Sequence, residues 1–140
     1  MRGSLKAAFD AEMARYRHSR TTGEDQTAWL ALERAHILSQ AYAWPHTWVH
    51  WEMFRLGMAR GNWHEVLGQI PRLMLAAPGS ITGRAPLGNT GRSDVGIFTP
   101  MPIPDDLMRL LARLEALGID KAYWEEIAKK HGVPIEVILV

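Results

Sequence analysis

The chain has no cysteine among its 140 residues. This absence excludes disulfide bonds, thiolate metal sites and cysteine nucleophiles, so histidine, aspartate, glutamate and methionine are the remaining candidate metal ligands. Net charge is also nearly absent, because 16 Lys and Arg are balanced by 15 Asp and Glu and the formal charge is +1. Such a balance gives no electrostatic attraction toward nucleic acid or membranes. We therefore expect neither as a partner.

Long apolar runs are missing as well. No run approaches the roughly 18 apolar residues that a membrane-spanning helix needs, and the N-terminal stretch lacks the apolar core of a signal peptide. These features predict a cytoplasmic protein. The length allows one hydrophobic core, and the 47% hydrophobic and 22% charged fractions are typical of a globular domain.

What the chain does contain is apolar residues at helical spacing. The pattern predicts an all-α fold, a small helical bundle or helical-hairpin array. The expected helices cover residues 5–16, 26–42, 45–59 and 63–76, the last kinked at Pro71, followed by a C-terminal pair over 106–117 and 120–130 and an apolar tail over 135–140. We expect a core domain over 1–104, with a Gly/Pro-rich irregular segment at 78–104, and a helical appendage over 105–140 packed on it.

The stretch from Glu33 to His50 holds one carboxylate and three of the six histidines. Glu33 and His36 are three residues apart and share a face of one helix, while His46 and His50 are four apart and share a face of the next. A short turn around Pro45 makes the two helices antiparallel neighbours, so these side chains can meet. Glu-x-x-His units hold iron, manganese or zinc in helical bundles.

Whether each pair of side chains points into the protein is clearer for the helix at 45–59 than for the helix at 26–42. In the helix at 26–42 the polar stripe that includes Glu33 and His36 fits either a narrow solvent face or an internal polar site. In the helix at 45–59 the Glu52 and Arg55 side chains mark an outer face, which turns His50 inward. His46 lies in the first turn, where the helix dipole favours the neutral imidazole, and we expect it at the rim of a site.

These observations favour a mononuclear metal site. The predicted ligands are Glu33, His36, His46 and His50, with Glu12 as a further carboxylate on the apolar stripe of the first helix. Two histidines and one carboxylate with open positions suit iron(II) or zinc. A metalloenzyme and a metal-handling protein both agree with this pattern.

The Gly/Pro-rich segment contains five glycines and five prolines between Pro78 and Pro104. Its stretch GRAPLGNT at 83–90 approaches the phosphate-binding motif G-x-x-x-x-G-K-[ST], but an asparagine replaces the lysine and Pro86 removes a backbone donor, so we reject a nucleotide loop. Its polar residues could still hold a small molecule or an anionic ligand, namely Arg84, Asn89, Thr90 and Arg92. Apolar residues such as Ile97 and Phe98 predict that the segment is ordered against the helices.

Three stretches resemble a small bacterial family catalogued as a domain of unknown function: ERAH at 33–36, HTWVH at 46–50 and GSITGRAPLGNTGRSDVG at 79–96. The resemblance covers about the first hundred residues. It implies no particular activity, but members are associated with metal-resistance gene neighbourhoods, which supports the metal hypothesis.

A weaker similarity relates W-x-x-L-E-x-x-H at 29–36 and GNWHEVLGQIPRLMLAAP at 61–78 to tetratricopeptide helix pairs. It implies the alternative function, a non-catalytic protein-interaction module whose histidines line a peptide groove or face water. The sequence leaves a homo-oligomer open under either hypothesis. A His36 side chain that points to water would favour the interaction module.

Overall fold

The computed structural model describes residue 1 and residues 3–115, and within this part of the chain it contains five α-helices and no strand. The all-α prediction is therefore confirmed. The helices are α1 (Gly3–Thr22), α2 (Asp25–Ser39), α3 (Ala43–Ala59), α4 (Trp63–Ile81) and α5 (Asp105–Glu115). The predicted helix at 120–130 and the tail at 135–140 lie outside the described residues.

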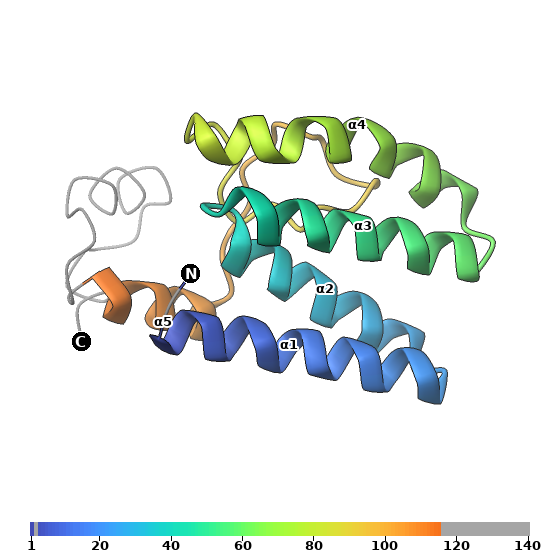
Figure 1. Cartoon of the computed structure of the whole chain (residues 1–140), viewed down its shortest axis with the longest axis horizontal. Helices are drawn as coiled ribbons and strands as arrows, with labels where there is room; N and C mark the ends of the chain where they lie inside the picture. Colours follow the sequence, from blue (N-terminus) through green and yellow to red (C-terminus); the bar gives the residue numbers. More distant parts are fainter. Residues whose placement is uncertain (2, 116–140) are drawn as a thin grey trace.

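The first four helices form two successive antiparallel hairpins. Each helix packs on the next, α1 on α2, α2 on α3 and α3 on α4, and Figure 1 shows α2 and α3 between the outer helices α1 and α4. The connection between α2 and α3 is only residues 40–42, because α2 ends at Ser39 and α3 begins at Ala43. This tight turn places the start of α3 beside the end of α2.

The hydrophobic core lies mainly among α1, α2 and α3. Its members are small or flexible on α2 and larger on the flanking helices: Met13, Tyr16, Ala28, Ala31, Leu32, Ala35, Val49, Met53 and Leu56. Glu52, which the sequence placed on the outer face of its helix, is buried against this core with 4% of its surface exposed. The prediction is wrong because the Tyr16 side chain of α1 reaches this face of α3, where its hydroxyl donates a hydrogen bond of 2.8 Å to the Glu52 carboxylate.

A second, smaller core joins α5 to the N-terminal hairpin. Ile103 and Leu107 are buried together with Leu5, Ile37 and Leu38. At its edge Arg34 of α2 forms ion pairs with Glu12 and Asp106. Glu12 thus has a structural cation as its partner.

Helix α4 has the reverse of the usual amphipathic pattern. Its buried face carries the polar residues Glu65, Gln69, Arg72 and Ser80, together with Val66 and Ala76. Large apolar side chains point outward instead, among them Trp63, Leu67, Ile70, Met74 and Ile81. Buried polar side chains need hydrogen-bond partners inside the protein, so α4 must face other polar groups in the interior.

The predicted end of α4 near Ala76 is also wrong, because the helix continues through both Pro71 and Pro78 to Ile81. Proline removes one backbone donor and frees the carbonyl four residues before it. The two freed carbonyls belong to Leu67 and Met74, whose side chains are exposed, so water can satisfy them. The irregular segment consequently starts at residue 82, four residues later than expected from Pro78.

Residues 82–104 cross the open side of the bundle between α4 and α2, as Figure 1 shows. Gln40, directly after α2, anchors the segment twice: its side-chain nitrogen donates to the Pro86 carbonyl and its side-chain oxygen accepts from the Gly88 amide. Arg72 of α4 donates to the Val95 carbonyl. These bonds fix the segment over the polar face of α4.

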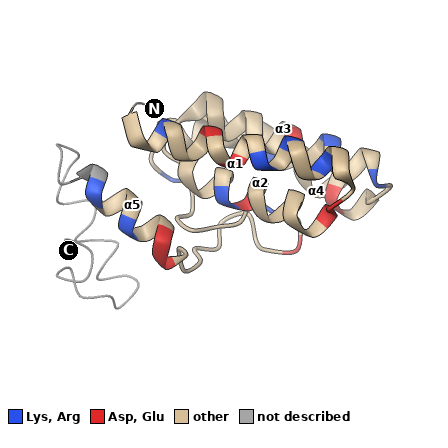
Figure 2. Cartoon of the chain, turned by 90° about the horizontal axis from the view of Figure 1, so that it is seen from below, with Lys and Arg blue, Asp and Glu red and all other residues tan. Residues whose placement is uncertain are grey.

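Basic and acidic residues are interspersed along the helices in Figure 2, in line with the near-zero net charge. Among the described helices, none has the length and apolar character required to cross a membrane.

Candidate metal centre

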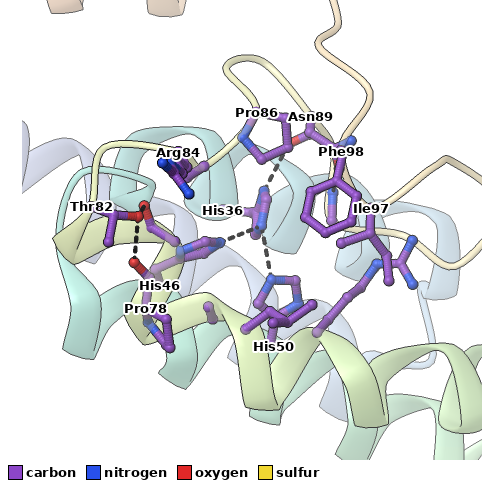
Figure 3. A pocket seen from close by; sticks show the side chains of 16 residues that line it. His36, His46, His50, Pro78, Thr82, Arg84, Pro86, Asn89, Ile97 and Phe98 are labelled. Carbon is purple, nitrogen blue, oxygen red and sulfur yellow. Dashed lines mark hydrogen bonds between the residues drawn. The ribbon is translucent and has the colours of Figure 1, made fainter.

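Three histidines from two helices meet in the interior. His36 comes from the last turn of α2, and His46 and His50 come from successive turns of α3. Their exposed fractions are 2%, 4% and 3% respectively. Figure 3 shows their rings turned toward one another beside the segment that carries Asn89. His46, expected at the rim, is therefore part of the buried group.

The Nε2 atoms of the three rings converge on one point. His36 Nε2 lies 3.1 Å from His50 Nε2 and 2.8 Å from His46 Nε2. One ligand nitrogen from each ring lies within 4.8 Å of the others. The predicted approach of His36 and His50 to within coordinating reach is confirmed.

The outer nitrogen of each ring has a hydrogen-bond acceptor. His36 Nδ1 lies 2.7 Å from the Asn89 carbonyl, and His50 Nδ1 lies 2.7 Å from the Gln69 side-chain oxygen. His46 Nδ1 lies 2.8 Å from Ser80 Oγ, whose own hydrogen is donated to the Gln40 carbonyl. Because all three partners accept, each Nδ1 carries the hydrogen, and each neutral ring presents a bare lone pair at Nε2.

Burial keeps these rings neutral. It lowers the pKa of His46 to about 4 and that of His50 to about 3. The pKa of His36 is lowered well below its usual value, by burial first and then by the neighbouring His50 and His46. Neutral imidazole is the form that binds metal ions.

Three lone pairs that face one another at these distances repel unless a cation lies between them. Zinc binds imidazole nitrogen at about 2.0–2.1 Å, so a tetrahedral ion would hold two such nitrogens about 3.3 Å apart. The observed 2.8 and 3.1 Å are shorter than that spacing by about half an ångström or less. The group could therefore hold a metal ion.

Gln69 connects the histidines to a charged cluster. Its amide nitrogen donates to the Glu65 carboxylate at 2.7 Å and to the Gly91 carbonyl at 2.8 Å, which turns its oxygen toward His50. Burial raises the pKa of Glu65, but hydrogen bonds from Gln69, Arg92 and Ser93 outweigh it, and the net pKa is lowered. Glu65 is therefore ionised, and it holds Gln69 in the orientation that His50 needs.

The irregular segment approaches His36 closely at Gly91. This residue has a φ of +80°, and a Cβ there would lie 2.7 Å from His36 Cδ2, so a side chain would collide with the ring. Asn89 stabilises the turn, because its side-chain oxygen accepts from the Gly91 amide while its nitrogen donates to the Gly96 and Thr99 carbonyls. Gly91 therefore lets the segment come close enough for the Asn89 carbonyl to accept from His36 Nδ1, which fixes the tautomer of His36.

A cavity of about 280 Å³ adjoins the histidines. Its apolar walls include Leu75, Ala76, Pro78, Ile97 and Phe98, and its polar lining includes Arg72, Thr82 and Arg84. Thr82, Arg84 and Phe98 are exposed, so the cavity leads from the buried rings to the surface (Figure 3). A metal ion held by three rings would have an open coordination position accessible from this cavity.

The two carboxylates predicted as ligands lie elsewhere. Glu33 forms an ion pair of 3.0 Å with Arg92 and is not among the grouped ligand atoms. Burial raises the pKa of Glu33, while the Arg92 guanidinium opposes that shift. Glu12 pairs with Arg34 at the opposite side of α2.

The predicted anion-binding residues divide in two. Arg84 lines the cavity, and Asn89 lines it too, although both hydrogens of the Asn89 amide are used within the segment. Arg92 bridges Glu33 and Glu65 and lies 3.9 Å above the Trp29 ring, so its charge is already matched. Thr90 Oγ1 accepts from the Arg92 amide and takes no part in the cavity lining.

Sequence reasoning assigned no role to the residues that orient the rings. Gln69 and Ser80 of α4 accept from His50 and His46, and Glu65 and the Gln40 carbonyl hold these two acceptors in place. On α4, Glu65, Gln69, Arg72 and Ser80 recur at intervals of four, three and eight residues, which is a polar stripe of helical period within an otherwise apolar helix. That stripe is the signal that could have identified them.

No curated protein and no solved structure matches the chain. The family described as proteins of unknown function, DUF3703, matches residues 3–111, a range that includes the three histidines, the α4 stripe and the segment around Asn89. The chain therefore belongs to this family of proteins of unknown function, DUF3703.

Proposed function

We propose that this protein binds one divalent transition-metal ion through the Nε2 atoms of His36, His46 and His50. The fourth coordination position faces the cavity and is filled by water or by an exogenous ligand. The protein is thus a mononuclear metal-binding protein with an exchangeable ligand position.

The observation that carries this proposal is the convergence of three bare lone pairs. A buried histidine cluster that served only packing would pair its ring nitrogens as donors and acceptors. Here every Nδ1 faces an acceptor, on Asn89, Gln69 and Ser80, and the tautomer that satisfies all three leaves the Nε2 atoms without a hydrogen between them. Outer acceptors that fix the ligand tautomer are typical of protein metal sites.

The donor set favours zinc over iron. The sequence suggested iron or zinc on the basis of two histidines and one carboxylate, but Glu33 is paired with Arg92, and the grouped ligands are three nitrogens. Three histidines and one open position form a common tetrahedral zinc site, whereas non-haem iron(II) sites usually include a carboxylate. Zinc is therefore the ion that we propose first.

The cavity supplies little for side-chain acid–base catalysis. Among the described residues that line it there is no carboxylate, and its only imidazoles are the three proposed ligands. Zinc lowers the pKa of a bound water to about 7, but an efficient hydrolase also needs a positioned proton acceptor. We therefore propose metal binding with ligand exchange, and we assign no reaction.

The interaction-module alternative requires a different environment for the histidines. It places them in a peptide groove or in water, whereas all three are buried and His36 Nε2 lies within 3.1 Å of His50 Nε2. This burial supports the metal proposal.

The test is metal titration of chelator-treated full-length protein. Zinc should bind at one ion per chain, and cobalt(II) should give the intense visible absorption of a tetrahedral site. His50→Ala and the more conservative His50→Gln should each reduce the affinity at least about 100-fold, because one of three protein ligands is lost.

The matched control is His18→Ala, which removes an exposed histidine of α1. It should bind zinc like the wild type. Equal zinc affinity of the wild type and a folded His50→Gln variant would overturn the proposal, as would the failure of the wild type to bind zinc or cobalt.

A further inference from the structure

The cavity beside the histidines contains positive groups and no negative one. Arg72 and Arg84 line it, and no aspartate or glutamate is found among its lining residues within the described part of the chain. Arg72 is 6% exposed, and its guanidinium donates to the Gly68 and Val95 carbonyls. Both acceptors are neutral, so neither compensates the charge. Arginine has five N–H donors, which leaves Arg72 with unused ones.

The proposed metal ion adds to the excess of positive charge around the cavity. Three neutral imidazoles leave a divalent ion with its full charge of two, in a site walled by apolar side chains. Of the nearby carboxylates, Glu33 and Glu65 are paired with Arg92. The charge of Asp94 also acts on Arg72, but Asp94 does not line the cavity. Buried charge is costly unless an opposite charge accompanies it. An anion in the cavity would supply that charge.

The walls indicate what kind of anion fits. Leu75, Pro78, Ile97 and Phe98 provide apolar surface beside the two guanidinium groups. The volume of about 280 Å³ is slightly below the roughly 300–1,000 Å³ typical of ligand pockets, so the ligand must be small. A small, fully hydrated inorganic anion would leave these walls unused, whereas a polymer would not fit.

We propose that the cavity binds a small monocarboxylate with an apolar body, whose carboxylate is the fourth ligand of the metal. This inference rests on the proposed metal site. One carboxylate oxygen binds the ion and the other accepts from Arg72 or Arg84, since guanidinium donors match carboxylate geometry. The apolar body lies against Ile97 and Phe98.

The probe for this proposal is benzoate added to the cobalt(II)-loaded full chain. Cobalt binding is first measured alone, at one ion per chain. Benzoate should then change the visible cobalt absorption in a saturable way, whereas the neutral isostere benzamide should not. Acetate and inorganic phosphate should bind more weakly than benzoate, because they bury less apolar surface.

Three variants and a control separate the recognition of charge from the recognition of shape. Arg84→Met should raise the Kd for benzoate at least about tenfold at unchanged cobalt affinity, because one charge-assisted contact is lost. The control Arg17→Met alters an exposed arginine of α1 and should leave the Kd unchanged. Phe98→Ala should weaken benzoate but not acetate. Arg72→Lys keeps the charge without the planar fork and should also weaken benzoate.

The outcomes distinguish this inference from the proposed function. Cobalt that binds stoichiometrically but does not respond to benzoate overturns the carboxylate inference alone. Equal responses to benzoate and benzamide overturn it too, because charge would then not be recognised. If benzoate binds equally to wild type, Arg84→Met and Arg72→Lys, the role given to the arginines is wrong. Failure to bind cobalt at all overturns both proposals.

Discussion

A partly buried charged cluster and a buried histidine cluster meet at Gln69, and they differ in how completely their groups are paired. In the charged cluster Arg92 lies between Glu33 and Glu65, and Glu65 also accepts from Gln69 and Ser93. In the histidine cluster the outer nitrogens are paired, but the inner Nε2 atoms of His36, His46 and His50 meet only one another. The side-chain amide of Gln69 belongs to both clusters, because its oxygen faces His50 and its nitrogen donates to Glu65.

This difference separates a structural role from a binding role. A buried charge that is fully paired is stable in the folded state only while its partners remain. It has no unpaired charge with which to bind a ligand. A set of neutral acceptors without a donor is tolerated because the surrounding bonds hold it in place, and it favours a cation. We therefore expect changes in the charged cluster to alter stability and changes in the histidine cluster to alter binding.

The largest effect should come from the charged cluster. Arg92→Met leaves Glu33 and the deeply buried Glu65 without their cation. Breaking a fully buried pair costs about 3–5 kcal/mol, and because Arg92 and Glu33 are partly exposed we expect a loss of about 3 kcal/mol. The free energy of unfolding from urea titration should fall by that amount, with or without zinc. Zinc affinity of the folded protein should change by less than about tenfold, because Arg92 contacts none of the three rings.

Arg60→Met is the control for this loss. Its partner Asp25 has 46% of its side chain exposed, so the pair should contribute less than about 1 kcal/mol. A similar stability loss in both variants would contradict the special place given to Arg92.

Zinc should stabilise the wild type but not a variant that lacks a ligand. At a free zinc concentration of about 100 times Kd, mass action adds about 2.7 kcal/mol, which for a domain of this size raises the melting temperature by about 10 °C. His36→Ala should show little of this increase in differential scanning fluorimetry. An equal zinc-dependent increase in His36→Ala would place the ion elsewhere.

A smaller effect should follow when the support of one ring is removed. Ser80→Ala deletes the acceptor of His46 Nδ1 and leaves all three proposed ligands in the sequence. Loss of such a hydrogen-bond partner lowers metal affinity by about 10- to 100-fold. Competition with a chromophoric chelator measures the change. Thr47→Val is the control, since that hydroxyl donates within its own helix to the Ala43 carbonyl. Unchanged zinc affinity in Ser80→Ala would show that the hydroxyl does not orient His46.

The helices and the meeting of the histidines could be predicted because both depend on local spacing. His46 and His50 are four residues apart, and a short turn necessarily brings their helix beside the one that carries His36. The helix ends were predicted less well. Whether Pro78 ends a helix depends on whether the freed carbonyl reaches water, which is a property of the packed structure.

The assignment of Glu33 could not be settled by the same reasoning. Positions three apart on a helix differ by about 60° in direction, and this rotation is enough to turn Glu33 toward Arg92, which is 59 residues away in sequence. The carbonyl of Asn89 that orients His36 is 53 residues away. Such contacts depend on the path of the irregular segment, and side-chain periodicity contains no information about it.

The smallest predicted effect concerns a paired polar contact on the other face of α3, between Tyr16 and Glu52. Burial, together with the hydrogen bond to Glu52 and its charge, raises the pKa of Tyr16 to about 12. A raised pKa means that the folded state holds the proton more tightly than the unfolded state. The associated stability is therefore complete below about pH 10 and is lost as the pH rises toward 12.

Urea titrations at pH 8 and pH 11 should show this loss as a decrease on the order of 1 kcal/mol in the wild type. Tyr16→Phe should be less stable by about 1 kcal/mol at pH 8, because the hydrogen bond is gone, but it should lack the tyrosine-dependent part of the alkaline decrease. Its zinc affinity should equal that of the wild type, since Tyr16 is paired with Glu52 and lies in the core among α1, α2 and α3. An identical alkaline decrease in both proteins would show that Tyr16 does not titrate with folding. A changed zinc affinity would show that paired contacts in this fold also govern the histidine cluster.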